Sequence, residues 1–432
     1  MNFSVLTFGC KVNQGESEDI ISKMISFGYE FQGKKSSDIV IINSCSVTAE
    51  SDRKLRQCIR KIRKENPNAI IVLTGCMPQA FPEIARGFSE VQIVVGNTNK
   101  FDIPELIENY VKNKEKKFEV EDIRKIFKYN ENFFVSQSKE RYRAFLKIED
   151  GCDRFCSYCI IPYARGKVRS KPLQEIKENI LQLCENNYKE IVLTGINLSS
   201  YGKDLNCSLE DAIKVTCDCK NVKRVRLGSL EPDLITENLL NYLSKENKFC
   251  PQFHLALQSG SNNVLKRMRR RYTREQYIDL VNLIKEKLPF ATFTTDIMVG
   301  FPGETEEDFI DTLNIIEEVG FLKVHVFPYS VRPGTLAADF DFQIDKHLKT
   351  QRVQKTIDIS KETSRIILRS FMNFDMNVLY ESKDENGFYK GYTENYIPLK
   401  SKSDQDISGK ILKTSIIKLP EDEDFCVGKI IS

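Results

Sequence analysis

Two features of other protein classes are absent from this chain. It begins MNFSVLTFGC, without the basic segment, long apolar segment or small-residue cleavage site of a secretory signal. No stretch of about 18 apolar residues would span a membrane. We therefore expect a soluble, cytoplasmic protein with no membrane contact. In a reducing compartment its cysteines are expected to be metal or catalytic ligands rather than disulfides.

Histidine and net charge are also scarce. The chain has 3 His, and 64 Lys plus Arg against 61 Asp plus Glu, a net charge of +3. The net charge therefore does not indicate a nucleic-acid partner, and any basic surface that binds one must be local. We find no internal repeat and no low-complexity tract. With 432 residues, 41% hydrophobic, the chain is long enough for two or three domains with ordinary cores.

Cysteine, by contrast, is plentiful, and three of the 13 form a compact cluster. Cys152, Cys156 and Cys159 lie in GCDRFCSYC with the spacing C-x3-C-x2-C. Three thiolates on one loop suit a [4Fe-4S] cluster, which normally takes four ligands, so one iron stays open. An open iron points to S-adenosylmethionine (SAM) and radical chemistry. Zinc is the alternative, but it needs a fourth ligand, and all three His lie more than 90 residues downstream. Purely structural thiols are the remaining alternative.

A second set of three cysteines is spread along the first part of the chain. Cys10, Cys45 and Cys76 each end a short apolar run, in TFGC, INSC and LTGC. Helical patterns separate these runs, which predicts a parallel sheet. Ligands of such sheets gather beyond the carboxyl ends of the strands. The pattern therefore predicts a second cluster, although any one of these cysteines alone would suit a core thiol.

The chain divides into three predicted parts, of α/β class overall. Residues 1–118 are predicted as an N-terminal domain with a parallel α/β sheet, and the segment 101–137 is interpreted as largely a connection, with a boundary near 138. Residues 138–368 alternate strands and helices about six times, which predicts an open or partial (β/α)6 barrel with its site at the carboxyl ends of the strands. Residues 370–432 contain short strands and turns, which predicts a small β-barrel. This last part carries 8 Lys and no Arg against 11 Asp plus Glu.

The whole chain resembles the radical-SAM methylthiotransferases. The resemblance runs through TFGCKVNQ, NSCSVT, TGCMPQ, GCDRFCSYCIIPYARG, HLALQSGSNNVLKRMRRRYT, GFPGETEEDF and FPYSVRPGT. It implies that Cys152, Cys156 and Cys159 hold a radical-SAM [4Fe-4S] cluster and that Cys10, Cys45 and Cys76 hold an auxiliary [4Fe-4S] cluster that carries or delivers sulfur. One SAM would methylate the sulfur and a second would supply a 5′-deoxyadenosyl radical. The last domain resembles the RNA-binding TRAM domain.

Two stretches indicate a branch of this family. GCKVNQ (9–14) and GYTENYIPLK (391–400) resemble the branch that adds a methylthio group to carbon 2 of N6-threonylcarbamoyladenosine at position 37 of tRNA. The alternatives are the isopentenyladenosine branch, which usually reads GCQMN, and the branch acting on a ribosomal-protein aspartate, which usually reads GCPKN. A non-catalytic, metal-stapled RNA-binding protein is the alternative of another class. The expected partners are a tRNA anticodon stem-loop, SAM and an electron donor such as flavodoxin or ferredoxin.

Further candidates follow from the resemblance, each beside a structural alternative. Tyr158 is expected near the SAM adenine, or as a ring that shields the cluster. The backbone at Gly195 is a candidate for binding the methionine amino group. Arg226 and Ser229 are candidates for the SAM carboxylate or ribose, with a structural ion pair as the alternative for Arg226. Gln258 and the turn from Gly300 to Gly303 are expected to line the adenine pocket, or to be turn residues only.

Three basic runs are interpreted as contacts to RNA phosphates, although a charge run is more often a solvated face. They are Arg267, Arg269, Arg270, Arg271 and Arg274; Arg53, Lys54, Arg56, Arg60, Lys61, Arg63 and Lys64; and Arg165, Lys167, Arg169 and Lys171. The seven other cysteines are interpreted as core or surface thiols: Cys58, Cys184, Cys207, Cys217, Cys219, Cys250 and Cys426. His254, His325 and His347 are interpreted as too scattered to form a site.

Overall fold

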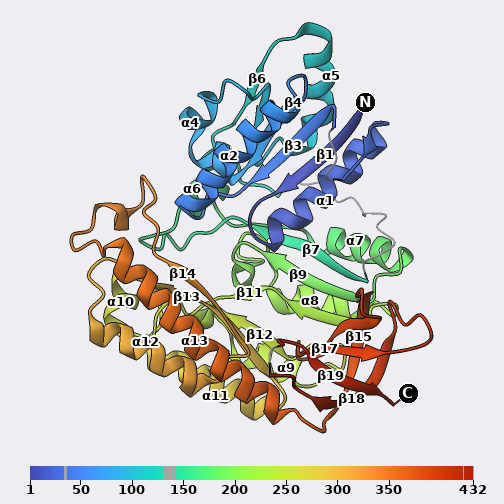
Figure 1. The fold of residues 1–432 in the computed structure, drawn as a ribbon, viewed down its shortest axis with the longest axis vertical. Coiled ribbons are helices and arrows are strands. Elements are labelled where there is room, and N and C mark those ends of the chain that lie inside the picture. The colour runs from blue at the N-terminus through green and yellow to red at the C-terminus, as the bar shows by residue number, and fades with distance from the viewer. Residues whose placement is uncertain (34–36, 130–141, 422, 432) are drawn as a thin grey trace.

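The computed structural model describes residues 1–33, 37–129, 142–421 and 423–431. It contains an N-terminal α/β sheet, a curled central α/β barrel and a small C-terminal β-barrel, as Figure 1 shows. The predicted boundary near residue 138 lies outside the described residues. None of the described helices is long and apolar enough to cross a membrane.

The N-terminal sheet is parallel throughout, as the alternating pattern predicts. Its order is β2 (Glu30–Phe31), β1 (Asn2–Thr7), β3 (Ile39–Ser44), β4 (Ile70–Gly75), β5 (Ile93–Val95) and β6 (Lys117–Glu119). The helices are α1 (Lys11–Ser26), α2 (Ala49–Glu65), α3 (Cys76–Ala80), α4 (Pro82–Arg86) and α5 (Ile103–Asn113). β3 and β4 are buried along their whole length because both sheet faces are covered.

The segment interpreted as a connection contributes more than expected. Residues 103–113 form α5, as their pattern suggests, but KFE then forms β6 and pairs with β5. A strand of three residues carries no readable period, so only the pairing reveals it.

The central strands curl into a partial barrel made of two four-stranded sheets. Their orders are β10 (Arg224–Leu227), β9 (Glu190–Gly195), β7 (Arg143–Asp150), β8 (Arg169–Ser170), and β11 (Ser229–Leu230), β12 (Gln252–Leu255), β13 (Thr292–Val299), β14 (Lys323–Pro328). The helices are α6 (Ile161–Arg165), α7 (Leu173–Glu185), α8 (Leu209–Asp218), α9 (Glu237–Leu243), α10 (Asn262–Arg267), α11 (Arg274–Lys287), α12 (Glu306–Val319) and α13 (Lys346–Ser370). The α/β class and partial barrel are therefore confirmed.

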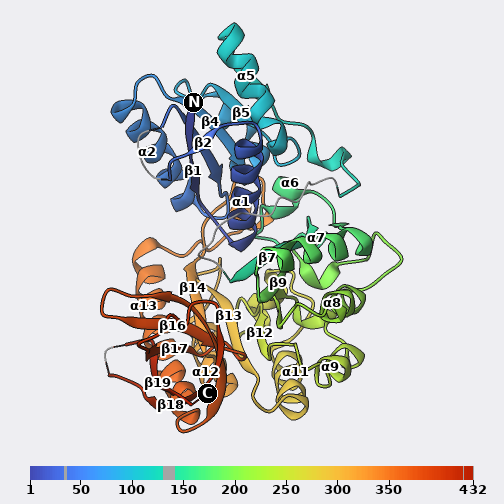
Figure 2. The ribbon, with the colours of Figure 1, turned by 90° about the vertical axis from the view of Figure 1, so that its right-hand side faces the viewer.

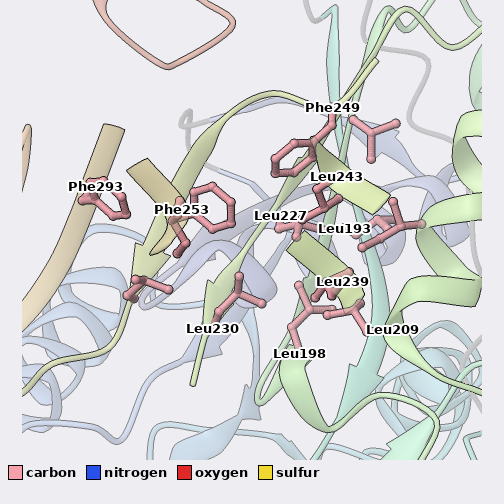
Figure 3. Packing of buried hydrophobic residues seen from close by; sticks show 14 of the residues in the cluster. Leu193, Leu198, Leu209, Leu227, Leu230, Leu239, Leu243, Phe249, Phe253 and Phe293 are labelled. Carbon is pink, nitrogen blue, oxygen red and sulfur yellow. The ribbon is translucent and has the colours of Figure 1, made fainter. Parts of the chain in front are cut away.

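One apolar core holds the barrel strands to their helices. Figure 3 shows Leu193 and Leu227 from neighbouring strands beside Leu209 and Leu239, while Phe253 lies near Phe293. Phe253 and Phe293 stack with ring centroids 6.1 Å apart. This packing fixes the strands, and hence the loops that follow their carboxyl ends.

The C-terminal strands close into a barrel, as predicted. The order is β15 (Asp375–Lys383), β16 (Phe388–Thr393), β17 (Pro398–Lys402), β19 (Cys426–Ile430) and β18 (Ile411–Lys418). In Figure 2 this barrel lies beside the barrel strands β12–β14 and below the N-terminal sheet. Arg224 of β10 links the C-terminal barrel to the central domain, because its guanidinium donates to the backbone oxygens of Tyr392 (3.1 Å) and Asn377 (2.6 Å).

Candidate active site

The loop cysteines, Cys152, Cys156 and Cys159, follow β7 directly. Gly151 makes the sharp turn with φ +90°, and a Cβ there would lie 1.9 Å from the backbone oxygen of Lys167. The Cys152 amide then donates to the oxygen of Gly166 (2.9 Å) and the Cys159 amide to that of Cys156 (3.0 Å). The nearby thiols of Cys156 and Cys152 add to the rise that burial causes in the pKa of Cys159.

The surroundings of the loop cysteines suit a cluster better than a single ion. Asn197 Nδ2 lies 3.7 Å from Cys152 Sγ, and Arg270 Nη1 lies 3.5 Å from Cys156 Sγ, so N–H groups point at sulfur. Four ligands around zinc would hold sulfurs about 3.8 Å apart. Among the described residues, the one group of three ligand atoms within 4.8 Å contains no cysteine. Burial raises the pKa of Cys152 to about 12, so a metal must displace the proton.

The strand-end cysteines, Cys10, Cys45 and Cys76, do come together. Cys10 precedes α1, Cys45 follows β3 and Cys76 begins α3 after β4. Because β1, β3 and β4 are parallel neighbours, their carboxyl ends meet. Burial raises the pKa of Cys45 to about 11, and the Cys76 and Cys10 thiols beside it add to the rise. The Val47 amide lies 3.5 Å from Cys45 Sγ.

Arg165 joins the two cysteine sets. It ends α6, six residues after Cys159, and its side chain is 0% exposed. Its Nε lies 3.3 Å from Cys76 Sγ, and its Nη2 donates to Asn13 Oδ1 at 3.0 Å. The same guanidinium pairs with Glu16. The central domain thus places a cation directly against a thiol of the N-terminal sheet.

Glu16 anchors the buried charges beneath this junction. Burial alone would raise its pKa, but Arg165, Lys100 and Lys147 outweigh that and hold the pKa of Glu16 well below its usual range. Lys100 and Lys147 each lie 2.7 Å from its carboxylate. Such a network fixes the two domains against each other, because losing one partner would leave a buried charge unpaired.

The other predicted residues divide between the site and the scaffold. Tyr158 packs with Phe301 in a small apolar cluster, next to Arg270 and the loop cysteines. Gly195 ends β9, and a Cβ there would lie 2.6 Å from Glu149 Oε2. Ser229 begins β11 and is exposed.

The predicted turn residues after β12 and β13 lie at strand ends. Gln258 has φ +71° and exchanges backbone hydrogen bonds with Asp296 and Met298. Gly300 has φ +72°, and its amide donates to the Glu304 carboxylate (3.0 Å). A Cβ on Gly300 would lie 2.4 Å from Lys349 Cγ, so the turn needs glycine for space as well as for conformation.

Arg226 lies deeper in the barrel than its predicted role suggests. It is 1% exposed, and its Nε donates to Glu190 Oε1 at 2.9 Å. Its guanidinium carbon lies 4.7 Å from the ring centroid of Tyr396 in the C-terminal barrel. This placement favours the alternative interpretation of Arg226, a structural ion pair.

The interpretation of the basic runs as phosphate contacts needs correction for two of the three, whereas the run on α2 is largely exposed and stays a prediction. Arg165, Arg169 and Lys171 are buried, and only Lys167 of that run is exposed. Arg270 is paired with Glu231 beside Cys156. Basic residues next to a buried domain junction form ion pairs there. The sequence alone does not distinguish such residues from exposed ones that contact RNA.

Two residues that the sequence analysis missed border the loop cysteines. Glu149 is 0% exposed and Asn197 4% exposed, and the Asn197 amide donates to Glu149 Oε2 at 2.7 Å. Burial raises the pKa of Glu149 well above its usual range. Glu149 Oε1 and Asn197 Oδ1 are buried and lack a hydrogen-bond partner among the described residues. Two such acceptors beside Cys152 suit a cationic ligand group.

The interpretation of the histidines as scattered is wrong for two of the three. His254 and His325 have ring centroids 6.0 Å apart, and His254 Nε2 lies 3.2 Å from Asp296 Oδ2. The three ligand atoms lie within 4.8 Å, so the group can hold a proton or a metal ion. The residues come from β12, β13 and β14, and only the strand register brings them together.

Comparison with known proteins identifies the family. Residues 146–316 match the model of the radical SAM superfamily, and residues 2–96 match that of the uncharacterized protein family UPF0004. The threonylcarbamoyladenosine tRNA methylthiotransferase MtaB of Bacillus subtilis is 38% identical over 95% of this chain and 93% of its own length. The chain belongs to the radical-SAM tRNA methylthiotransferases. Membership of this family of enzymes implies a [4Fe-4S] cluster and SAM.

Other methylthiotransferases agree with this placement, and a solved structure shares the fold. MtaB of Thermotoga maritima is 37% identical over 90% of this chain and 89% of its own length. The tRNA-2-methylthio-N(6)-dimethylallyladenosine synthase of Finegoldia magna is 33% identical over 96% and 92%. The radical S-adenosylmethionine methyltransferase TsrM of Kitasatospora setae shares the fold at TM-score 0.57, with 13% identity, over 78% of this chain and 77% of its own.

Proposed function

We propose that this methylthiotransferase adds a methylthio group to carbon 2 of N6-threonylcarbamoyladenosine at position 37 of tRNA. The observation that carries the proposal is the joining of two cysteine sets by Arg165. The loop cysteines follow the first barrel strand, and the strand-end cysteines lie at the carboxyl ends of strands in the N-terminal sheet. Arg165, which follows the loop cysteines, contacts Cys76 of the strand-end set. The substrate is inferred from the MtaB relatives, whose names specify threonylcarbamoyladenosine.

Cys152, Cys156 and Cys159 would hold the radical-SAM cluster, and Cys10, Cys45 and Cys76 would hold an auxiliary [4Fe-4S] cluster. Bound there, the clusters and SAM supply the sulfur, the methyl group and the radical, which no side chain can provide. The protein contributes N–H groups aimed at the sulfurs, from Asn197, Arg270 and Arg165. Such donors tune iron-sulfur clusters.

The carboxylate of Glu149 and the amide oxygen of Asn197 would receive the methionine amino group of SAM. Both have a buried acceptor atom with no hydrogen-bond partner among the described residues. A Cβ on Gly195 would lie 2.6 Å from Glu149 Oε2, and Asn197 Nδ2 lies 3.7 Å from Cys152 Sγ. An ammonium donates in three directions, and its positive charge would offset the burial that raises the pKa of Glu149, so that the carboxyl group binds it in the ionised form. Tyr158, Gln258 and Gly300 remain candidates for the adenine side.

Three functional domains follow from the proposal: residues 1–118 for the auxiliary cluster, 138–368 for SAM and 370–432 for RNA. The partners would be a tRNA anticodon stem-loop, whose loop base can be unstacked, and an electron donor such as flavodoxin or ferredoxin.

The test uses the full chain, reconstituted without oxygen, with SAM, dithionite and synthetic anticodon stem-loops. About eight iron atoms per chain would match two clusters. The stem-loop carrying threonylcarbamoyladenosine should gain a methylthio group by mass spectrometry. Cys76→Ala should retain reductive cleavage of SAM and lose methylthiolation, whereas Cys152→Ala should lose both. Methylthiolation of the dimethylallyladenosine stem-loop or of a ribosomal protein instead would contradict the proposed substrate.

A further inference from the structure

The two stretches that mark the branch, from opposite ends of the chain, meet in space. Lys11 belongs to GCKVNQ and Tyr396 to GYTENYIPLK. Lys11 Nζ lies 5.9 Å from the ring centroid of Tyr396. Lys11 directly follows Cys10, so this meeting point borders the strand-end cysteines. A contact between the first domain and the last, at the edge of the site, is well placed to read the substrate.

Positive charge exceeds negative charge around Tyr396. The guanidinium carbons of Arg226 and Arg143 lie 4.7 Å and 5.3 Å from its ring centroid. Glu190 is shared by three arginines, being 2.9 Å from Arg143, 2.9 Å from Arg226 and 3.7 Å from Arg224. Arg143 has a second partner in Glu381, at 3.3 Å. With Lys11, four cations thus face Glu190, Glu381 and, beside Lys11, Asp296, and such an excess attracts an anion.

Lys11 is the cation near Tyr396 that pairs with neither Glu190 nor Glu381 in the described part of the chain. Its side chain makes no hydrogen bond or ion pair among the residues that the structure describes, and it is exposed. Asp296 acts on it electrostatically, but Asp296 is held by His254 at 3.2 Å. Arg226 also keeps one buried nitrogen, Nη1, without a hydrogen-bond partner in the described part of the chain.

The backbone of Tyr396 adopts a conformation that is unfavourable for a residue with a side chain, and contacts of the side chain hold it there. Its φ is +71°, a region that side-chain-bearing residues rarely adopt. Its ring stacks on Tyr392 with centroids 4.5 Å apart and planes 15° apart, and its hydroxyl lies 3.3 Å from Arg143 Nη1. Strained backbone of this kind concentrates at ligand sites.

We propose that Lys11 pairs with the carboxylate of the threonylcarbamoyl group of the target nucleoside, with Arg226 and Tyr396 forming the wall of this subsite. The inference rests on the proposed function. The threonyl carboxylate is the one anionic group of this nucleoside, and a dimethylallyl group in place of the threonylcarbamoyl group carries no charge. An ammonium and a guanidinium are the side chains that recognise a carboxylate. Lys11 would be left without a partner when an apolar group enters this subsite, which gives specificity.

The experiment measures binding by the reconstituted full chain to three anticodon stem-loops. They carry threonylcarbamoyladenosine, its methyl ester or unmodified adenosine at the target position. The native chain should bind the first about tenfold or more tightly than the other two, because a hydrogen bond to a charged group is worth at least that factor. Lys11→Gln should remove this preference and leave the affinity for unmodified RNA unchanged. Lys11→Arg should keep most of it.

Lys54→Gln is the matched control, since it removes an exposed cation from α2 in the same domain and should keep the preference. Equal loss of affinity for all three RNAs in Lys11→Gln would assign Lys11 to a phosphate and overturn the proposal. A preference retained in Lys11→Gln would also overturn it. The methyl ester tests the carboxylate even if the variant misfolds, because equal binding of ester and acid by the native chain refutes the subsite. Methylthiolation of the acid by the native chain, measured in parallel, shows whether the subsite alone or the proposed substrate has failed.

Discussion

At the scale of single residues, Arg165 offers the most direct test of coupling between the two cysteine sets. Arg165→Lys keeps a cation near Glu16, but one ammonium cannot also reach Cys76 and Asn13, which the guanidinium contacts at 3.3 Å and 3.0 Å. Hydrogen bonds to sulfur favour the reduced cluster. We expect the reduction potential of the auxiliary cluster to fall by about 20–60 mV, the equivalent of one net hydrogen bond. A redox titration followed by electron paramagnetic resonance measures it.

Arg169→Lys is the control for this prediction. Arg169 is buried in the same network, 3.4 Å from Asp150, and donates to the backbone oxygens of Arg165 and Lys167, but it has no hydrogen bond to a cysteine among the described residues. Its variant should leave the potential unchanged. An equal shift in both variants would mean that general loosening of the junction, rather than the bond to Cys76, sets the potential.

At the scale of elements, the turn from β4 into α3 decides where Cys76 points. Gly75 has φ +98°, and a Cβ there would lie 2.4 Å from the backbone oxygen of Ser44 on the neighbouring strand. Gly75→Ala should therefore displace Cys76 and lower iron from about eight to about four atoms per chain. Reductive cleavage of SAM should persist, because the loop cysteines follow β7. Iron and sulfide analysis after anaerobic reconstitution measures the loss.

Gly28→Ala is the control that separates the effect of backbone strain from that of steric overlap with a neighbouring strand. Gly28 also has a positive φ, +85°, but a Cβ there has open space around it. It should cost stability, since an L side chain disfavours this conformation, yet leave the iron content at the native level. A full complement of iron in Gly75→Ala would show that the turn tolerates the extra carbon.

The strand ends also explain which parts of the site were predictable. Cys10, Cys45 and Cys76 end apolar runs, and a parallel sheet brings equivalent ends together whatever its exact register. His254, Asp296 and His325 meet only because the register of β12, β13 and β14 aligns them. A shift of one residue would turn each side chain to the other face. No local pattern carries that register, so the sequence could not reveal the group.

At the scale of the whole molecule, two of the three basic runs lose cations to burial and ion pairs among the residues that the structure describes. Burial and pairing remove Arg165, Arg169, Lys171 and Arg270 from the cations expected to contact RNA. Arg274 is also paired, with Glu318 at 2.7 Å. Binding of the stem-loop should therefore depend less on these two runs than their sequence suggests, and the substrate carboxylate subsite should carry much of the selectivity.

Arg271 is the cation through which the remaining footprint can be tested. It is exposed, follows the Arg270 that contacts Cys156, and has no ion pair among the residues described by the structure. Arg271→Ala should weaken binding of modified and unmodified stem-loops alike, and reduce the slope of log affinity against log salt by about 0.7–0.9. Lys112→Ala, on α5 at the far end of the N-terminal sheet, should change neither quantity. Fluorescence anisotropy from low to high salt measures both, and a native slope in Arg271→Ala would place the RNA elsewhere on the molecule.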